Sequence, residues 1–374
     1  MSPSDPQPHA GITEILTARV AASDFPSAVY LIGERGAIVF SGAVGNAVVE
    51  PQQIRATTET IYDLASLTKP LVTALLCTLR IQSGELTLES SVSHYLPEFD
   101  RTDKQSITIQ QLLTHSSGLP AWRPLYILAE GEADRAAGAI ANVDLEYKSG
   151  TRVVYSDLGF IAIGLMLQRI TGKSLAELAK AEIFEPLSLR HTFFNPEAAT
   201  QTGIAACETG NGYERQTCKD SNAGEYKNWR ESLIWGEVHD GNAFFLGGAA
   251  GHAGLFSTAA ETFALANQFL AGQSKLLTPD ACKLFRRNAT EGLDESRSIG
   301  WQLAVTKDST AGPELPPDSF GHLGFTGTSC WIDPNAERVL ILLTNRTHAH
   351  RLPFTNINSV RRQFNTLAMR ALEG

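Results

Sequence analysis

The sequence predicts a mixed α/β (α+β) protein with one antiparallel sheet flanked by helices and a helical domain inserted into it. Strand patterns lie at both ends of the chain and helical patterns lie between them. The length of 374 residues predicts two or three structural units. We therefore expect a sheet domain built from residues 1–60 and 245–374, a mainly helical domain over residues 61–244, and chain ends that lie close together.

The strands follow from apolar and polar alternation. The segments SAVYLIGE and AIVFSGAV, joined across Gly33 to Gly36, predict a β-hairpin after a short helix near Ile12 to Val20. Near the C-terminus, IGWQLAV, HLGFTGTS, CWIDP and VLILLTN predict further short strands. A final helix is expected from Asn356 to Leu372.

The helices between the strands are marked by apolar periodicity and by capping residues. They are expected at Leu67 to Gln82 before Gly84, Thr108 to Leu113, Leu158 to Thr171 before Gly172, and Ser174 to Glu182, with a capping box at Thr258 to Glu261. The segment of about residues 195–242 is polar and weakly periodic. Such a long segment is usually functional or poorly ordered.

Charge and composition exclude several classes of protein. Lys and Arg number 31 against 40 Asp and Glu, so the net charge of −9 predicts no affinity for nucleic acid. The most apolar stretch, Leu158 to Leu167, is about half of a membrane span and is expected to be a buried helix. The N-terminus resembles no secretory signal, so a cytoplasmic protein is expected, or a periplasmic one if a native signal was removed.

The five cysteines show no metal or disulfide pattern. They are odd in number and scattered, which favours a reducing compartment. Cys207 and Cys218 are the one pair whose spacing leaves a disulfide open under oxidising conditions.

The first chemical motif is Ser66-Leu-Thr-Lys69. Three residues apart at a helix start, the two side chains share one face, so the lysine reaches the serine hydroxyl. Pro70 requires Ser66 to lie at the very beginning of the helix, where the dipole and free N–H groups stabilise an oxyanion. The structural alternative is an N-cap serine with a surface lysine, and the motif alone leaves the two interpretations about equal.

Two more motifs follow in order. Tyr155 and Asp157 precede an apolar helix, where a phenol can be a general base if Lys69 lowers its pKa. The alternative is that Asp157 caps the helix and Tyr155 is an ordinary core residue. The third motif runs from His322 through Gly324 to Gly327, with glycines on a strand where a backbone approaches a ligand.

Together these motifs resemble the serine β-lactamase and penicillin-binding-protein superfamily. SGELTLESSVSHYLPEF, ITIQQLLTHSSGLP and GGAAGHAGLFSTAAE also resemble its class C-like branch, which includes family VIII carboxylesterases, DD-peptidases and muramoyl-L-alanine amidases. The resemblance covers nearly the whole chain. It implies a β-lactamase-like fold, with an active site between the two domains, and catalysis that needs no metal or organic cofactor.

The resemblance also implies residue roles. Ser66 would be the acylated nucleophile, Lys69 its proton-relay partner and Tyr155 the general base. The N–H groups of Ser66 and Phe325 would form the oxyanion hole, and the acyl-enzyme would then be hydrolysed by water. The expected activity is that of a carboxylesterase or amidase on a small-molecule ester or amide.

Two departures from the family pattern bear on the substrate. Asp157 replaces the usual Asn, which removes an amide donor and adds a negative charge beside Lys69. His322 replaces the lysine of K-T-G, so a permanent cation becomes a titratable one. We therefore expect Asp157, His322 and Gly324 to bind substrate, and β-lactamase activity to be weak or absent.

Several alternatives stay open at this stage. GEVHDGNAFFLGGAAGHAGLF resembles the subgroup of exo-acting muramoyl-L-alanine amidases, so a muropeptide is a second candidate substrate. His239, Asp240, Asn242 and His252 are candidate cleft residues, with His252 expected to bind substrate, and turn chemistry and tight packing are the alternatives. A slowly deacylating penicillin-binding or sensor protein is a third candidate. The sequence leaves the oligomeric state open.

Three other chemistries are disfavoured by the motifs. The glycines around Gly251 mimic a phosphate loop but lack its G-K-[ST] context. His348-x-His350 lacks a third zinc ligand. The chain has no G-x-S-x-G nucleophile elbow. His115-Ser-Ser-Gly118 is expected to be mainly a structural turn.

Overall fold

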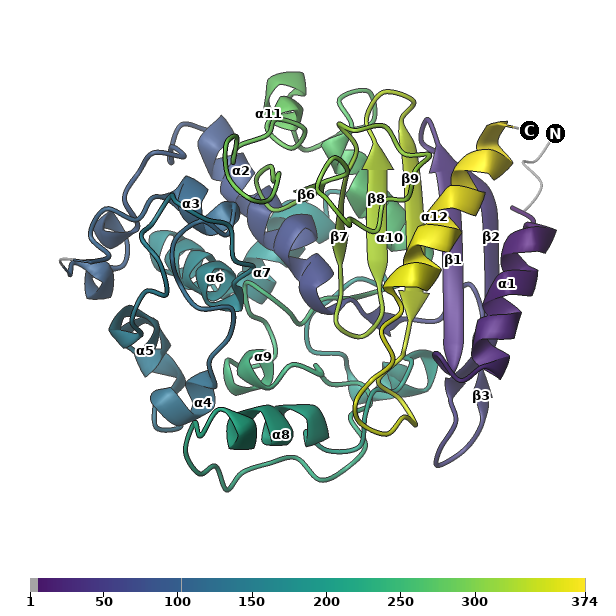
Figure 1. The fold of residues 1–374 in the computed structure, drawn as a ribbon, viewed down its shortest axis with the longest axis horizontal. Coiled ribbons are helices and arrows are strands. Elements are labelled where there is room, and N and C mark those ends of the chain that lie inside the picture. The colour runs from purple at the N-terminus through teal and green to yellow at the C-terminus, as the bar shows by residue number, and fades with distance from the viewer. Residues whose placement is uncertain (1–5, 102, 374) are drawn as a thin grey trace.

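A seven-stranded antiparallel sheet forms one half of the molecule (Figure 1). The structure is a computed structural model that describes residues 6–101 and 103–373. The strand order is β3-β2-β1-β9-β8-β7-β6, and every neighbouring pair is antiparallel. The strands are β1 (Ser27–Glu34), β2 (Ala37–Val48), β3 (Ile54–Arg55), β6 (Gln302–Leu303), β7 (Phe320–Leu323), β8 (Ser329–Asp333) and β9 (Arg338–Thr344). The predicted mixed α/β class with an antiparallel sheet is confirmed.

The predicted hairpin is present and its turn has the expected backbone. Arg35 and Gly36 both have positive φ, at 50° and 77°, which is the turn geometry that matches strand twist. Strand β1 then pairs with β9 on its other side, with Tyr30 opposite Leu342. The centre of the sheet is therefore made from the two ends of the chain.

Side chains of the central strands alternate between two cores. Tyr30 and Ile32 lie in a cluster with residues of α1 (Ala10–Ala21) and α12 (Asn358–Glu373), which cover one face of the sheet. Val29 and Leu31 belong to the main core on the other face, together with Phe263 of α10 (Ala259–Ala266) and residues of α2 (Leu75–Gln82). Helices α1 and α12 lie side by side (Figure 1) and Arg19 bonds Gln363, so the first and last helices of the described chain meet, as expected.

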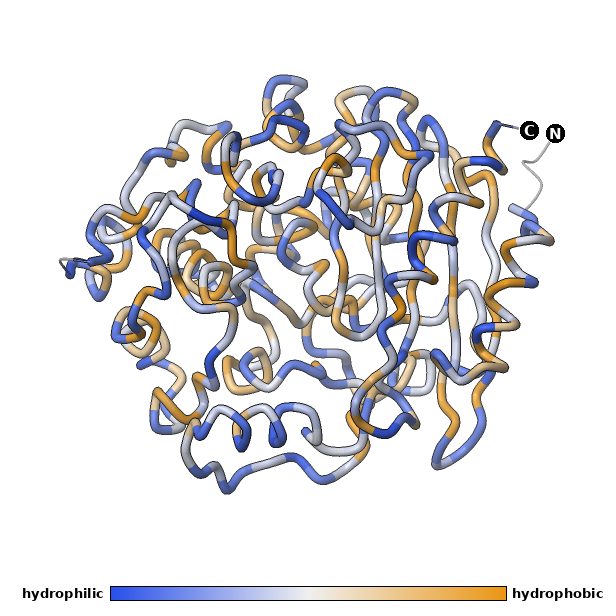
Figure 2. The backbone as a smooth tube through the Cα atoms, viewed as in Figure 1, coloured by the Kyte–Doolittle hydropathy of each residue, from blue (hydrophilic) through white to orange (hydrophobic). Residues whose placement is uncertain are grey.

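The other half of the molecule is mainly helical. The long helix α6 (Asp157–Thr171) is buried along most of its length, as its apolar sequence predicts. By contrast, α8 is mostly hydrophilic and lies at the periphery (Figure 2). The helices are α3 (Ile109–Leu113), α4 (Leu125–Leu128), α5 (Ala136–Asn142), α6 (Asp157–Thr171), α7 (Leu175–Ala179), α8 (Gly212–Asp220), α9 (Gly241–Phe245) and α11 (Pro279–Lys283).

Some predicted elements differ in detail. The helix expected from Leu67 begins as a 3-10 turn (Ala65–Leu67) and a π-helical turn (Lys69–Ala74) before α2. The capping box at Thr258 is only half formed, because the Glu261 carboxylate accepts hydrogen bonds from the backbone N–H groups of residues 190 and 191 instead. The strand expected in IGWQLAV is only the two residues of β6.

The polar segment of residues 195–242 is more ordered than its weak periodicity indicated. It holds a 3-10 helix (Ala198–Gly203) and the whole of α8. All five cysteines are free and buried, so Cys207 and Cys218 are not paired. Among the described residues, no helix has both the length and the apolarity needed to cross a membrane.

Candidate active site

The segment that leads to Ser66 is held by a buried carboxylate. Ala65 has a φ of 48°, a left-handed conformation that costs an L-residue about 1–2 kcal/mol. Asp63 Oδ1 accepts a hydrogen bond of 2.8 Å from the Ala65 N–H. Asp63 Oδ2 accepts another of 2.8 Å from the His239 N–H. Asp63 therefore fixes the turn that puts Ser66 at the start of the helix, where the sequence predicted it.

Lys69 is fully buried, and its ammonium group has three oxygen partners. Its Nζ atom lies 2.9 Å from Ser66 Oγ, 3.1 Å from the His252 carbonyl and 2.7 Å from Asp157 Oδ1. Burial alone lowers the pKa of Lys69, but the negative charge of Asp157, together with the hydrogen bonds of the ammonium group, outweighs it and raises the pKa. Lys69 is thus an ammonium ion at neutral pH, and its full burial excludes the surface-lysine alternative.

The Tyr155 ring lies among cationic and aromatic groups. Lys69 Nζ lies 4.9 Å from the ring centroid, and the rings of His115 and His322 lie at 4.6 and 5.7 Å. Burial raises the pKa of the phenol, the Lys69 charge lowers it and the Asp157 charge raises it. The pKa stays above its usual value, so the resting phenol is neutral.

Asp157 is free to pair with Lys69 because it is not the helix cap. The Ser156 hydroxyl accepts from the Gly159 N–H and caps α6, which corrects the interpretation of Asp157 as the cap. His115 Nδ1 in turn accepts a hydrogen bond of 2.9 Å from the Ser156 N–H. The turn expected at His115 therefore has a second effect, since it supports the backbone that carries Tyr155.

His322 lies on β7 with one ring nitrogen engaged. Its Nδ1 atom donates to the Leu323 carbonyl over 2.9 Å. Burial and the positive charges of Lys69 and Arg297 hold the pKa of His322 well below its usual value. The expectation that His322 supplies a titratable cation near neutral pH is therefore wrong, because the imidazole stays neutral.

The glycine after β7 is needed for contacts within the protein. A Cβ atom on Gly324 would lie 2.0 Å from Thr328 Oγ1 and 2.6 Å from the Leu64 carbonyl oxygen. The strand end thus approaches the segment that carries Ser66, whereas the sequence had suggested the approach of a ligand.

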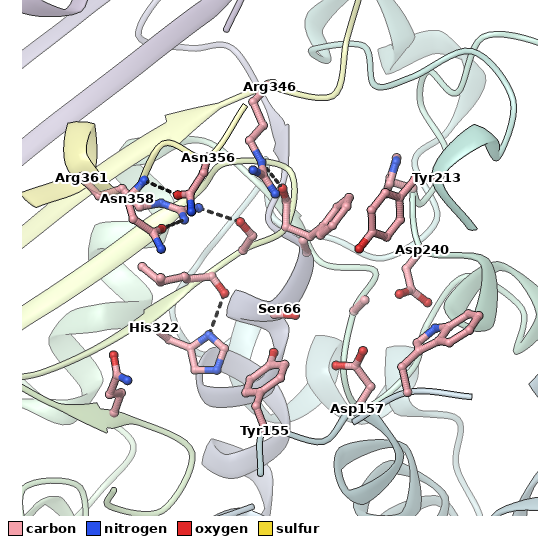
Figure 3. Close-up of a pocket in the computed structure, with 18 of the residues that line it drawn as sticks. Ser66, Tyr155, Asp157, Tyr213, Asp240, His322, Arg346, Asn356, Asn358 and Arg361 are labelled. Atoms are coloured by element: carbon pink, nitrogen blue, oxygen red, sulfur yellow. Dashed lines mark hydrogen bonds between the residues drawn. The ribbon is translucent and has the colours of Figure 1, made fainter. Parts of the chain in front are cut away.

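These groups line one pocket of about 580 Å³ (Figure 3). The predicted residues that the structure brings together there are Ser66, Tyr155, Asp157, His239, Asp240, His322, Gly324 and Phe325. Lys69 lies directly beneath, bonded to Ser66 and Asp157. The two proposed oxyanion-hole residues, Ser66 and Phe325, share this pocket.

Several pocket residues were missed by the sequence analysis. The sequence motifs gave no signal for the arginines, whereas the unusual length of the polar segment pointed to α8. The missed residues are Trp122, Tyr213, Glu214, Thr217, Arg297, Gln302, Arg346, Asn356, Asn358 and Arg361.

The pocket has opposite charges on two sides (Figure 3). Arg346 and Arg361 lie on one side, and burial together with the Arg346 charge lowers the pKa of Arg361 to about 9. Asp157 and Asp240 lie on the other, with the buried Glu214 of α8. Burial and the Asp240 charge raise the pKa of Glu214 to about 7.

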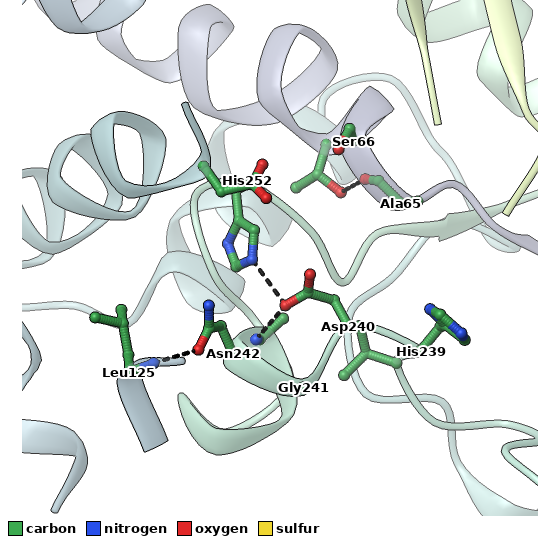
Figure 4. Close-up of polar contacts among 12 residues, drawn as sticks. Ala65, Ser66, Leu125, His239, Asp240, Gly241, Asn242 and His252 are labelled. Atoms are coloured by element: carbon green, nitrogen blue, oxygen red, sulfur yellow. Dashed lines mark hydrogen bonds and ion pairs between the residues drawn. The ribbon is translucent and has the colours of Figure 1, made fainter. Parts of the chain in front are cut away.

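His252 and Asn242 do not line the pocket, which corrects their assignment as cleft residues. The His252 side chain is 1% exposed and its Nε2 atom lies 2.8 Å from Asp240 Oδ1 (Figure 4). Asn242 is fully buried and bonds the backbone of Arg123 and Leu125. Both residues therefore act through the groups that they hydrogen-bond and do not line the pocket themselves.

One group of side chains has the spacing of a metal site. Ligand atoms of Asp157, Asp240 and His252 lie within 4.8 Å of one another. However, the Lys69 ammonium already pairs with Asp157, and a second cation there would be repelled. The donor set therefore fits a proton network better than a metal ion.

The disfavoured chemistries find no support in the geometry. A Cβ on Gly251 would lie 2.0 Å from the Phe160 carbonyl oxygen, so this glycine serves tight packing. Both ring nitrogens of His348 bond backbone groups, namely the Cys207 carbonyl and the Val49 N–H. They are not available to a zinc ion.

Comparison with known proteins identifies the family. The β-lactamase family model matches residues 12–361. A protein of Escherichia coli (strain K12), named as a proposed D-alanyl-D-alanine carboxypeptidase, is 32% identical over 353 residues, covering 87% of this chain and 79% of the relative. An N-acetylmuramyl-L-alanine amidase of Bacillus subtilis (strain 168) is 31% identical over 355 residues, covering 88% and 79%.

Solved structures share the fold at lower identity. EstCE1, a hydrolase with promiscuous acyltransferase activity, superposes with a TM-score of 0.72 at 21% identity, covering 95% of this chain and 98% of that one. A class C β-lactamase from Rhodobacter sphaeroides superposes with a TM-score of 0.72 at 18% identity, covering 98% and 100%. With a family model that spans nearly the whole chain and relatives above 30% identity, this protein belongs to the β-lactamase family of serine hydrolases.

Proposed function

We propose that the protein hydrolyses small-molecule esters or amides through an acyl-enzyme on Ser66. The observation that carries this proposal is the 2.9 Å contact between Ser66 Oγ and the buried Lys69 ammonium, at the floor of a pocket that also holds Tyr155. A serine hydroxyl is a weak nucleophile until a neighbouring base takes its proton. Ser66 supplies the nucleophile, Lys69 the neighbouring cation, and Tyr155 the phenol that takes the proton once it is ionised.

In the acylation step, ionised Tyr155 takes the proton of Ser66 as Oγ bonds the carbonyl carbon. The oxyanion that forms is stabilised by the N–H groups of Ser66 and Phe325. As the tetrahedral intermediate collapses, the bond to the leaving group breaks and Tyr155 returns the proton to that group. Water then hydrolyses the acyl-enzyme by the same steps in reverse order.

Asp157 limits this reaction at neutral pH. Its charge keeps Lys69 protonated and opposes ionisation of Tyr155. It also offers no N–H to a substrate amide, unlike an asparagine. We therefore propose that activated esters are better substrates than β-lactams.

A second candidate is a muropeptide amidase or carboxypeptidase. Two relatives above 30% identity carry such names, and the pocket of about 580 Å³ is large enough for a peptide-like ligand. Its arginine side also suits an anionic group. Hydrolysis of defined muropeptides, scored by which bond is cut, separates this activity from that of an esterase.

A slowly deacylating sensor is the alternative from another class. The test is the lifetime of the acyl-enzyme, measured as intact-protein mass after mixing with an activated ester, with Ser66→Ala alongside. Fast loss of an adduct that needs Ser66 supports the hydrolase. A persistent adduct supports the sensor.

A further inference from the structure

Among the described residues, several buried polar atoms of pocket-lining side chains make no hydrogen bond, namely atoms of Asp157, Arg297 and Arg361 and the Nε2 atom of His322. Asp157 and Arg297 have ion-pair partners, whereas His322 has none among these residues. Within the part of the chain that the structure describes, His322 Nε2 makes no hydrogen bond, although the residue is only 4% exposed and lines the pocket. A buried polar atom without a partner is costly, so such atoms in binding sites are usually matched by a ligand.

The chemistry of that atom is fixed by its neighbours. Because Nδ1–H donates to the Leu323 carbonyl, the neutral ring carries its free lone pair on Nε2. The charged groups around the ring are Lys69, Arg297 and Arg361, all positive, and they oppose protonation. Two further titratable neighbours are Tyr155, whose phenol is neutral at rest, and His115, whose pKa burial and the Arg297 charge hold well below its usual value. Nε2 is therefore an acceptor at neutral pH.

The position of His322 beside Tyr155 places it near the leaving group of the substrate. In the proposed mechanism Tyr155 returns a proton to the leaving group, so that group must pass the phenol. His322 belongs to strand β7, and its ring centroid lies 5.7 Å from that of Tyr155. The unpartnered nitrogen thus faces the leaving group rather than the acyl group.

We infer that His322 Nε2 accepts a hydrogen bond from the leaving group and selects leaving groups that carry an N–H or O–H donor at this position. This inference rests on the proposed function and deepens it by naming a substrate class. A carboxylate there would place lone pairs against the Nε2 lone pair, with no proton between them, so it would lose this hydrogen bond although Lys69, Arg297 and Arg361 attract its charge. A lysine at the same position would select the opposite group, since it only donates.

The test uses three acetyl esters with nearly isosteric leaving groups. They are 3-acetoxybenzamide, which carries amide N–H donors, 3-acetoxybenzoate, which carries a carboxylate, and methyl 3-acetoxybenzoate, which is neutral and has no donor. For the natural protein at pH 7.5 we expect kcat/KM for the amide to exceed that for the carboxylate by about tenfold. It should also exceed that for the methyl ester severalfold. Equal values for all three compounds would overturn the inference.

Substitutions of His322 should either reverse or preserve the preference for the amide ester. His322→Lys replaces an acceptor by a donor, so the carboxylate ester should become the better substrate. His322→Gln keeps an acceptor and cannot ionise, so the preference for the amide should remain. A ratio that His322→Lys leaves unchanged would show that another group sets the preference, and it would contradict the inference.

Arg297 provides an electrostatic test of the same point. Its guanidinium is buried, pairs with Glu295 over 2.8 Å, and is one of the charges that keep His322 neutral. Arg297→Gln removes one of these charges, so His322 should gain a proton more readily. In this variant the ratio of kcat/KM for the carboxylate ester to kcat/KM for the amide ester should rise as the pH falls from 8 to 5.5, whereas in the natural protein the ratio should stay constant. The matched control is Arg152→Gln, because Arg152 lies 5.7 Å from the Tyr147 ring outside the pocket.

A measurement without turnover separates this inference from the proposed function. In ¹⁵N-labelled protein, the imidazole signals that disappear in His322→Gln should report an unprotonated Nε2 from pH 5.5 to 8. A doubly protonated ring at pH 6 would overturn the inference even if Ser66 is acylated as proposed. Conversely, a protein that is not acylated at Ser66 would refute the proposed function while leaving the state of the ring measurable.

Discussion

Lys69 Nζ lies 2.7 Å from Asp157 Oδ1, and this ion pair sets the resting charge of the candidate site. The carboxylate raises the pKa of Lys69 and adds to the burial that raises the pKa of Tyr155. The site therefore rests as ammonium and neutral phenol. A rate that depends on ionised Tyr155 should accordingly rise with pH.

Asp157→Asn should shift this pH dependence. Removing the negative charge lowers the pKa of both Lys69 and Tyr155, so ionised phenol is available at lower pH. We expect the rising limb of kcat/KM on p-nitrophenyl acetate to move down by about one pH unit, with higher activity at pH 7. Turnover of a chromogenic cephalosporin should also increase, because Asn restores an amide donor. An unchanged or upward-shifted limb would contradict this electrostatic account.

Asp63→Asn should lower kcat more than it raises KM. Asn accepts the Ala65 N–H, but its amide nitrogen then faces the His239 N–H, and two donors meet in a buried site. We expect a loss of about 1–3 kcal/mol in the free energy of unfolding and a kcat reduced about tenfold or more. The control is the same Asp-to-Asn change at the exposed Asp280, which should leave kcat unchanged. Full kcat in Asp63→Asn would show that the turn before Ser66 does not need this carboxylate.

Glu214→Gln should change the dependence of stability on pH. The folded-state pKa of Glu214 is raised to about 7 from an ordinary value of 4.5, so the stabilisation by the protonated form is present below pH 4.5 and lost as pH rises through 7. The loss is at most about 3 kcal/mol. Gln can still accept from Gly241 N–H and donate to the Tyr126 hydroxyl.

The measurement is urea unfolding of the natural protein and Glu214→Gln at pH 5 and pH 8. The variant should gain stability relative to the natural protein at the higher pH. The same difference at both pH values would mean that Glu214 does not titrate in this range.

Gly324→Ala should damage both folding and activity. The added methyl group would meet the Leu64 carbonyl oxygen at 2.6 Å, and backbone atoms cannot move aside as a side chain can. We expect a loss of about 2 kcal/mol or more in the free energy of unfolding. Gly138→Ala is a matched control in α5, where nothing lies within 4 Å and helix propensity favours alanine. Thermal unfolding of both variants decides the point, and a Gly324→Ala protein as stable as its control would refute the close approach.

Local patterns predicted the parts of the fold that local forces determine. The hairpin turn at Arg35 and Gly36, the apolar face of α6 and its end at Gly172 each depend on a few neighbouring residues. The meeting of Ser66, Lys69 and Tyr155 was predicted from the family resemblance that their motifs carry together, since each motif alone also had a structural interpretation. Ser66 and Tyr155 line the pocket, and Lys69 lies directly beneath it, bonded to Ser66.

The sequence could not predict contacts made by segments far apart. Arg297, Arg361 and Glu214 reach the pocket from a loop, from α12 and from α8, and none belongs to a motif. His252 was assigned to the cleft from the segment's resemblance to muramoyl-L-alanine amidases, but its ring bonds the pocket-lining Asp240 and does not itself line the pocket. The protonation state of His322 depends on those distant arginines, so it too required the structure.

The most direct test of the central claim is the intact mass of the protein after brief exposure to an activated ester and, in parallel, to benzylpenicillin. The account predicts a transient acyl adduct from the ester, little penicilloyl adduct, and no adduct on Ser66→Ala. Acylation or full turnover by Ser66→Ala would contradict the assignment of the nucleophile. A long-lived penicilloyl adduct on Ser66 would contradict the role given to Asp157 and identify a penicillin-binding or sensor protein.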